Sequence, residues 1–141
     1  MDLKDTNGNT VYKSTATNQK QAVEEAVKKG VNLAGVDLSG FILYGADLIG
    51  AKLRGAKLWS TYFYQADLTE ADLREADLRE ADLRDVVLWG TDLRGAKLLG
   101  ACMRRAKFSP SDMLQKGTKI LKSQAEDFLM ALGVKTFNDL L

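Results

Sequence analysis

The chain carries many charged side chains but few of the groups that usually perform catalysis. Its 141 residues include 19 Asp and Glu, 20 Lys and Arg, and no His. Without His there is no Ser-His-Asp triad, no Cys-His nucleophile pair and no His metal ligand. The sequence lacks a phosphate-binding loop and a nucleophile motif, and its carboxylates recur regularly rather than as one paired acid and base. We predict that the protein is not an enzyme and uses no cofactor and no metal.

The single cysteine, Cys102, has two interpretations. Arg104 and Arg105 beside it would lower the pKa of its thiol and make it reactive. It can also be an incidental surface residue, which we favour. One cysteine excludes internal disulfides and Cys-based zinc sites. With no apolar run of roughly 20 residues and no signal peptide at the start, the sequence predicts a cytoplasmic protein without a membrane span.

The charged residues belong to a five-residue repeat. Residues 66–85 read ADLTE ADLRE ADLRE ADLRD, and the same frame holds for 16 consecutive units across residues 31–110. The third residue of each unit is Leu, Phe or Met, the first is Ala in ten units, and the fifth is Gly in eight. The repeat therefore accounts for most of the 12 Gly in the chain.

A five-residue period fits neither a helix nor a continuous strand. In an α-helix a step of five residues turns by about 140°, so the third residues would point in every direction. In a strand, apolar spacings of two and then three residues reverse the side-chain face in every unit. A short extended piece followed by a corner fits, and Gly at the fifth position suits a corner with positive φ. Such units stack into a solenoid.

Outward residues twenty positions apart are alike, which predicts four units per coil. Tyr62 and Tyr64 follow Ile42 and Tyr44 at this spacing. We number the four faces of the coil by the third residues of the first coil, so that faces one to four begin at Leu33, Leu38, Leu43 and Leu48. At the same spacing face one repeats an arginine, and face two alternates in sign through Asp37, Lys57, Asp77 and Lys97.

With its A(D/N)LXX units, the sequence resembles the pentapeptide-repeat family. The resemblance covers residues 31–110 and implies an all-β solenoid, a right-handed four-sided β-helix of about four coils. It implies less about function, because solenoids have many roles. Members include fluoroquinolone-resistance and toxin-immunity proteins, which resemble DNA in shape and charge and bind type II topoisomerases. Other members have no assigned role.

The flanking segments are predicted to cover the ends of the solenoid, which would otherwise expose its core. Residues 1–30 are expected to form an N-terminal cap of short strands and a helix over 19–29 that begins after Asn18. Residues 111–141 are expected to form a helical C-terminal cap, with a helix over 119–132. That cap is also a candidate homodimer interface, because the topoisomerase-binding relatives pair through C-terminal helices. Its candidate residues are Ile120, Leu121, Phe128, Leu129 and Leu132.

Function is expected at the outward positions, because the inward ones explain only the core. Face three presents large apolar side chains, and a contiguous patch of this kind usually marks an interface. The candidate partner-binding residues are Ile42, Tyr44, Tyr62 and Tyr64, with Trp59 near the adjoining corner. Two interpretations stay open: the patch binds a protein or a second copy, or the N-terminal segment folds back over it. A smaller group on face four comprises Ile49, Val87 and Trp89.

The remaining outward residues are charged and are expected to compensate one another, each exposed pair contributing about 0–1 kcal/mol. Residues 65–85 carry a net charge of −5, whereas residues 51–60 carry +3 and residues 91–109 carry +4. The acids at the corners form a belt around one level rather than a track along the prism: Glu70, Glu75, Glu80 and Asp85. This arrangement argues against a DNA mimic.

The sequence favours a non-enzymatic protein-interaction module that acts through the outer surface of a rigid repeat prism. Its protein partner is unknown, and the near-neutral charge of +1 argues against direct binding of nucleic acid. The first alternative is a DNA-mimicking binder, inhibitor or protector of a type II topoisomerase. The second is a structural repeat protein that only self-associates.

Overall fold

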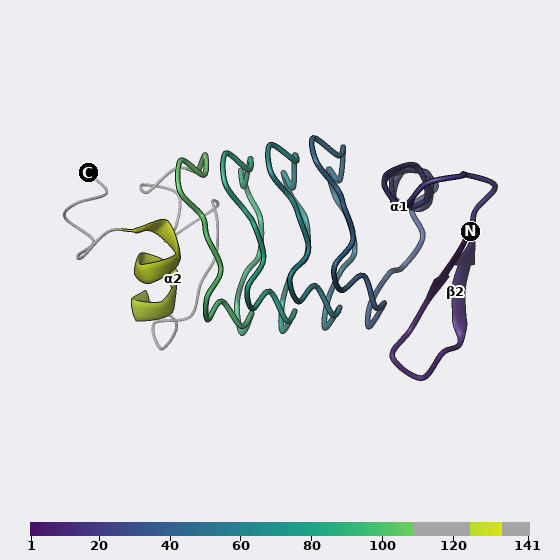
Figure 1. The fold of residues 1–141 in the computed structure, drawn as a ribbon, viewed down its shortest axis with the longest axis horizontal. Coiled ribbons are helices and arrows are strands. Elements are labelled where there is room, and N and C mark those ends of the chain that lie inside the picture. Colours follow the sequence, from purple (N-terminus) through teal and green to yellow (C-terminus); the bar gives the residue numbers. More distant parts are fainter. Residues whose placement is uncertain (109–124, 134–141) are drawn as a thin grey trace.

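The computed structural model describes residues 1–108 and 125–133. Its main body is a stack of coils, with β1, β2 and α1 at one end and α2 at the other (Figure 1). Parallel bridges join residues twenty apart, from Asn32–Lys52 to Val87–Lys107. This spacing confirms four units per coil. The bridges stay isolated because a corner follows each short extended piece.

Each corner is a tight turn whose third residue, the fifth of the repeat unit, has positive φ. The N–H of Val36 donates to the Leu33 carbonyl at 3.1 Å, and Gly35 between them has φ 70°. A type II turn requires this left-handed conformation at its third residue. The prediction for Gly at the corners is therefore confirmed. Seven other corners place a non-glycine residue in the same conformation, with φ from 53° to 61°: Ser60, Gln65, Glu70, Glu75, Glu80, Asp85 and Arg105.

Where the second position of the unit is Asp or Asn, its side chain fixes the start of the corner. Its carboxylate or amide oxygen accepts a hydrogen bond from the backbone N–H two residues later. Asp37, for example, accepts from the Ser39 N–H at 3.0 Å. The same bond joins Asp67 to the Thr69 N–H at 2.9 Å. Asp and Asn are favoured there because their short side chains reach this N–H, which faces away from the core.

The core is the column of inward side chains at the first and third positions. Phe63 and the leucines on either side of it in the stack are fully buried. Two first positions hold threonine instead of an apolar residue, and both are fully buried. Their hydroxyls donate to backbone carbonyls at 2.8 Å, Thr61 to Leu38 and Thr91 to Leu68. These bonds offset the desolvation of the buried hydroxyls.

The N-terminal segment comprises a hairpin and a helix. β1 (Asp2–Lys4) pairs antiparallel with β2 (Thr10–Lys13), and α1 (Gln19–Lys28) follows. The side chain of Asn18 accepts from the Gln21 N–H at 2.9 Å, which is the N-cap expected from the sequence. The helix ends one residue earlier than predicted, at Lys28. Its buried residues are Ala22, Val23 and Ala26.

The N-terminal segment also supplies the hydrogen-bond acceptors that the first coil needs. In later coils the second residue of a unit donates to the coil before it, as Tyr62 does to the Phe41 carbonyl at 2.9 Å. The first coil has no coil before it. Instead Asp37 donates to the Lys4 carbonyl at 2.8 Å, Ile42 to Gln19 Oε1 at 3.0 Å, and Asp47 to Glu24 Oε1 at 2.9 Å. These bonds pair backbone groups at an open edge.

At the other end, α2 (Ala125–Leu132) lies against the last coil. The N–H of Met103 donates to the Ala131 carbonyl at 2.6 Å, and Ala131 is buried. The first part of the predicted helix, residues 119–124, lies outside the described residues. Within residues 1–108 and 125–133, no helix is both long enough and apolar enough to cross a bilayer.

Candidate protein-interaction surface

Face three presents an apolar surface that the core does not need. We call Ile42, Tyr44, Tyr62 and Tyr64 the aromatic patch. Ile42 is 55% exposed, Tyr44 48% and Tyr62 41%, and Tyr64 is half-buried. Their inward neighbours Leu43 and Phe63 are fully buried. The repeat therefore fills its core without the four patch side chains, which extend outward.

The aromatic patch is contiguous across two coils. Ile42 bridges to Tyr62, so the two units lie in register. The Tyr44 ring meets the Tyr62 ring edge to face, with centroids 5.9 Å apart, and meets the Tyr64 ring in the same way at 6.2 Å. Edge-to-face contacts of this kind are favourable and orient the rings. The three tyrosines therefore form one preorganised surface.

Trp59 lies at the edge of this surface rather than within it. Its side chain is 51% exposed and precedes the corner at Ser60. Among the described residues it makes no ring contact with a tyrosine of the patch. Leu99, two coils further on at the same position of the unit, is 62% exposed. The sequence analysis did not single out Leu99, although its outward position was readable from the repeat.

The N-terminal segment lies beside the aromatic patch and leaves it open. A hollow of about 510 Å³ separates the two, lined by Met1 and residues 17–20 on one side and by Ile42 and Tyr44 on the other. We call it the groove. Both patch residues stay about half exposed there, so the described N-terminal segment does not cover them. The sequence left open whether the N-terminal segment folds back over the patch, and in the described residues it does not.

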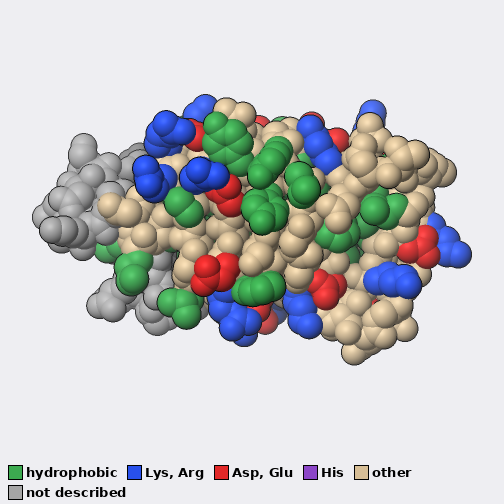
Figure 2. Space-filling model, in the orientation of Figure 1, with side chains coloured by type: hydrophobic (Ala, Val, Ile, Leu, Met, Phe, Trp, Pro, Cys, Tyr) green, Lys and Arg blue, Asp and Glu red, His purple; other side chains and the backbone are tan. Residues whose placement is uncertain are grey.

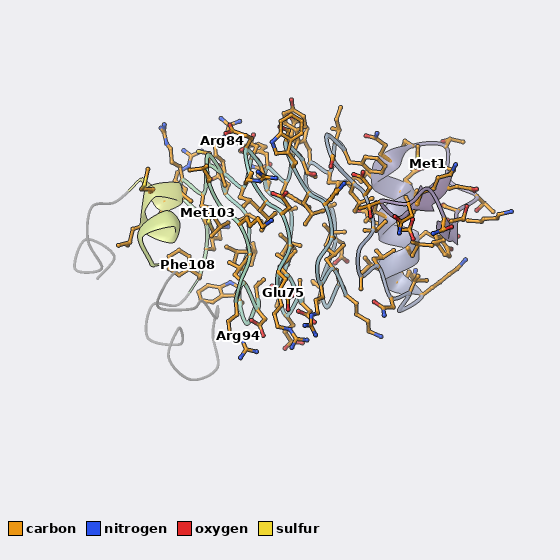
Figure 3. All side chains as sticks on the ribbon, turned by 90° about the horizontal axis from the view of Figure 1, so that it is seen from below. Met1, Glu75, Arg84, Arg94, Met103 and Phe108 are labelled. Atoms are coloured by element: carbon orange, nitrogen blue, oxygen red, sulfur yellow. The ribbon has the colours of Figure 1, made fainter. Side chains whose placement is uncertain are left out.

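Cations continue face three beyond the tyrosines. Figure 2 shows hydrophobic side chains grouped over the middle of one face, with Lys and Arg side chains toward its C-terminal end. Arg84 donates two bonds to the Asp82 carboxylate, at 2.7 and 2.6 Å, and lies 5.5 Å from the centre of the Tyr64 ring. The hydrogen bonds from Arg84 hold the pKa of Asp82 below its usual range. Arg84 projects on the opposite side of the prism from Glu75 and Arg94 (Figure 3).

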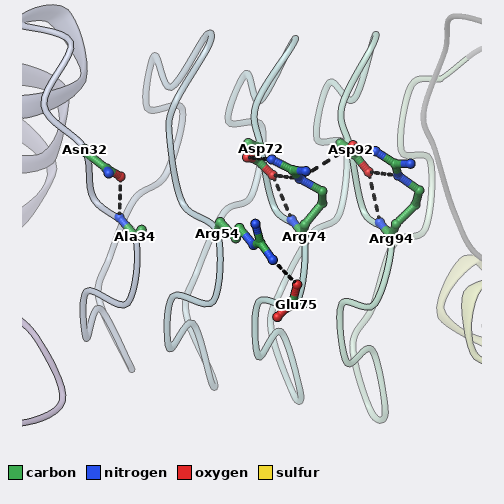
Figure 4. Close-up of polar contacts among 8 residues, drawn as sticks. All are labelled: Asn32, Ala34, Arg54, Asp72, Arg74, Glu75, Asp92 and Arg94. Atoms are coloured by element: carbon green, nitrogen blue, oxygen red, sulfur yellow. Dashed lines mark hydrogen bonds and ion pairs between the residues drawn. The ribbon is translucent and has the colours of Figure 1, made fainter.

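Face one is a surface of internally paired charges. Arg74 and Arg94 each donate two hydrogen bonds to the aspartate two residues earlier, Asp72 and Asp92, at 2.6 to 2.8 Å (Figure 4). Arg54 reaches the next coil and pairs with Glu75 at 2.6 Å. The predicted compensation is confirmed on this face. Exposed pairs of this kind add little stability, but they leave few charges for a partner.

Face two has the predicted register but different ion pairs. Lys57 bridges to Asp37 on one side and to Asp77 on the other, as the alternating signs predicted. Asp77 makes its close pair with Arg79 of its own unit, at 2.5 Å, rather than with a lysine of a neighbouring coil. The shorter path within the Asp-Leu-Arg unit explains the preference. Two acids of the corner belt are paired as well, Glu75 with Arg54 and Asp85 with Arg105.

The repeat geometry agrees with the comparison to known families. A sequence profile described as pentapeptide repeats matches eight copies, over residues 31–70, 46–85 and 71–109. Together these matches cover more than half of the chain. The chain belongs to the pentapeptide-repeat family. The resemblance stated from the A(D/N)LXX units is therefore confirmed.

Solved structures of other pentapeptide-repeat proteins are similar to this one. Alr5209 from Nostoc PCC 7120 has 28% identity and a TM-score of 0.52, over 72% of this chain and 94% of that one. AT2G44920, described as a thylakoid-lumen protein of Arabidopsis thaliana, has 30% identity and a TM-score of 0.41, over 72% of this chain and 75% of that one. Such proteins form right-handed quadrilateral β-helices. No curated protein matches this chain.

The structure of a trypsin-treated variant of QnrB1, a plasmid-mediated fluoroquinolone resistance protein, is also similar. It has 18% identity and a TM-score of 0.32, over 71% of this chain and 67% of that one.

The candidate dimer residues of this pentapeptide-repeat protein are only partly described. Leu129 is buried, and Leu132 is half-buried against the core of its own chain. Ile120, Leu121 and the side chain of Phe128 lie outside the described residues. Met130, which the sequence analysis missed, is 71% exposed and borders a hollow of about 110 Å³ beside Leu99.

The remaining candidates for chemistry are the carboxylates and the single thiol. Residues 1–108 and 125–133 contain no group of three or more His, Cys, Asp or Glu that could hold a metal ion. Cys102 is free and half-buried on face three, and Asp82 pairs with it across a parallel bridge. The second-position aspartates accept hydrogen bonds in turns, as Asp37 does from the Ser39 N–H, and those of the Asp-Leu-Arg units also pair with arginine.

Proposed function

We propose that this pentapeptide-repeat protein is a non-enzymatic interaction module that binds a protein partner through the aromatic patch. The observation that carries the proposal is the exposure of Ile42, Tyr44 and Tyr62, 41% to 55%, next to a core that is complete without them. Large rigid side chains held in contact with one another are typical of the centre of a protein interface. We keep a cytoplasmic location as part of the proposal.

The partner can be sought with matched variants. A tagged wild-type protein and a Tyr44→Ser/Tyr62→Ser variant would be used to capture proteins from host lysate, with mass spectrometry as the readout. Trp89→Ser on face four is the control, because Trp89 is 46% exposed and lies outside the patch. We expect one protein to be retained by the wild type and by Trp89→Ser and lost with the double variant. Binding of that protein in purified form would follow by calorimetry.

Folding must be checked in parallel. The free energy of unfolding of both variants, measured in urea, should lie within about 0.5 kcal/mol of the wild-type value. The reason is that exposed side chains away from special features contribute little to stability. If the double variant unfolds, the tyrosines are structural and the proposal loses its basis. If a specific partner is retained equally by the double variant, the patch is not its binding surface.

The DNA-mimic alternative is weaker, because a mimic of the DNA backbone needs unpaired acids in tracks. Among the described residues, the aspartates of all four Asp-Leu-Arg units are paired with their own arginines. A gyrase supercoiling assay is the direct check. We expect neither inhibition nor protection at micromolar protein, and either effect would favour the alternative. The second alternative, a protein that only self-associates, is tested by the mass measurement described below.

A further inference from the structure

The aromatic patch has cationic side chains at both of its ends. Lys20 lines the groove together with Ile42 and Tyr44. Beyond the tyrosines, Arg84 lies over the Tyr64 ring, and Arg104 occupies the same position of the unit in the next coil. We call this row of residues the strip. Its middle is the apolar aromatic patch, and its two ends carry Lys20 on one side and Arg84 and Arg104 on the other.

Three carboxylates on or beside this strip, Asp82, Asp85 and Glu24, are engaged by the chain itself. Both oxygens of Asp82 accept bonds from Arg84, and Asp85 pairs with Arg105 at 2.6 Å. At the other end, Glu24 Oε1 accepts from the Asp47 N–H at 2.9 Å and lies 3.8 Å from Lys20 Nζ, a long contact.

The cations are less fully compensated than the acids. Arg104 is exposed and makes no ion pair with any residue in the ranges 1–108 and 125–133. Among the described residues, Lys20 pairs only with Glu24, at 3.8 Å, and the nearer partner of Glu24 is a backbone N–H. The strip therefore presents positive charge that its own acids do not neutralise. Complementary charge on a partner would favour encounter and fix its register on the strip.

We propose that the strip binds an acidic, apolar segment of the partner protein, an inference that rests on the proposed function. Apolar side chains of the segment would occupy the groove and pack on Tyr44 and Tyr62, while its Asp or Glu residues pair with Lys20 and Arg104. Adjacent coils are about 4.8 Å apart, so three coil spacings span about 14 Å. An extended segment of about five residues covers the distance from Tyr44 to Arg104, and further residues would reach Lys20 on α1.

The test can be run before the partner has been identified. A phage-displayed library of random dodecapeptides is selected on the full wild-type chain, and binders to the Tyr44→Ser/Tyr62→Ser variant are removed. We expect the retained peptides to be enriched in Asp and Glu next to Leu, Phe or Tyr. A fluorescein-labelled peptide from this set is then titrated by fluorescence anisotropy at low and high salt, together with a version in which Lys replaces each acid.

Charge-reversal variants identify the cations that matter. Lys20→Glu and Arg104→Glu should each weaken the acidic peptide about fivefold, because an exposed ion pair contributes up to about 1 kcal/mol. Lys57→Glu and Lys97→Glu, which reverse cations on face two, are matched controls and should leave the affinity unchanged. The Lys-containing peptide should not bind, and the acidic peptide should bind less tightly as salt rises.

The outcomes separate this inference from the proposed function. Neutral or basic peptides that still require Tyr44 and Tyr62 would overturn the acidic segment and leave the patch as a binding surface. The same conclusion follows if the two charge reversals on the strip have no more effect than the face-two controls. If no selected peptide depends on the tyrosines, both the inference and the proposed function are wrong.

Discussion

At the scale of single residues, the fifth position of the unit carries a conformational cost. Positive φ is free for Gly but unfavourable for other residues, by about 1 kcal/mol. Unit by unit along the repeat, the fifth position is Gly from Gly35 to Gly55, another residue from Ser60 to Asp85, and Gly again from Gly90 to Gly100. The middle coils are therefore locally strained, in the same region that carries the acidic corner belt.

Relief of this strain is measurable at Gln65, whose φ is 58° and whose side chain is exposed. Gln65→Gly should raise the free energy of unfolding by about 0.5–1 kcal/mol, because Gly accepts positive φ. The reverse change, Gly55→Gln, should lower it by about 1 kcal/mol; a Cβ there meets nothing within 4 Å, so only the backbone is strained. Urea denaturation measures both, and equal stability of all three proteins would contradict the account.

At the scale of elements, one carboxylate joins the hairpin to the helix. Glu25 on α1 accepts hydrogen bonds from the Tyr12 hydroxyl at 2.7 Å, from the Ser14 hydroxyl and from Lys29 Nζ at 2.8 Å. These hydrogen bonds lower the pKa of Glu25 to about 2, and the bond from Lys29 has the largest effect. β2 is thereby tied to α1, the same helix that supplies Gln19 and Glu24 to the first coil.

The attachment of the hairpin should weaken in acid. The pKa of Glu25 is lower in the folded protein than its usual value of 4.5, so its contribution is complete above about pH 4.5 and is lost as the pH falls toward 2. Amide hydrogen exchange in β1 and β2 should therefore accelerate between pH 4.5 and 2, beyond the intrinsic change. Glu25→Gln should exchange faster at about pH 7 and lose this dependence. If amide exchange in Glu25→Gln still accelerated between pH 4.5 and 2 as in the wild type, other carboxylates would be responsible for the pH dependence.

At the scale of the whole molecule, the prism is a one-dimensional stack with two different ends. Each coil contacts only its neighbours, so the long faces stay free and the ends need other elements. At the first end, residues of β1 and α1 accept hydrogen bonds from the first coil. At the last end, α2 buries Leu129 and Ala131 but leaves Met130 71% exposed near Leu99. This apolar end is where a homodimer through the C-terminal helix would form.

Mass in solution tests the homodimer. We expect a dimer at high micromolar concentration, and Met130→Glu should shift it to monomer by placing a charge in the apolar contact. Lys57→Glu on face two is a control that should leave the dimer intact. Sedimentation equilibrium provides the measurement. A monomer at high micromolar wild-type protein would end the dimer prediction, and a dimer unaffected by Met130→Glu would place the interface elsewhere.

The sequence alone determined the coil, because the five-residue period excludes a helix and a strand by geometry. It also placed every inward and outward position, the N-cap at Asn18 and the patch of Ile42, Tyr44, Tyr62 and Tyr64 on one face. These conclusions needed only local periodicity, since each residue in a repeat has the same surroundings as its equivalent twenty positions on.

Only the tertiary structure decided the contacts that have no repeat. Nothing in the period shows that Gln19 and Glu24 accept from the first coil, or that the N-terminal segment stops beside Tyr44 and leaves a groove. The ion-pair partner of Asp77 was also decided by the tertiary structure, because Arg79 of its own unit and a lysine of a neighbouring coil compete for one carboxylate. The physical reason is the same in each case: these contacts depend on where a non-repeating segment or a flexible side chain lies in space, which periodicity does not encode.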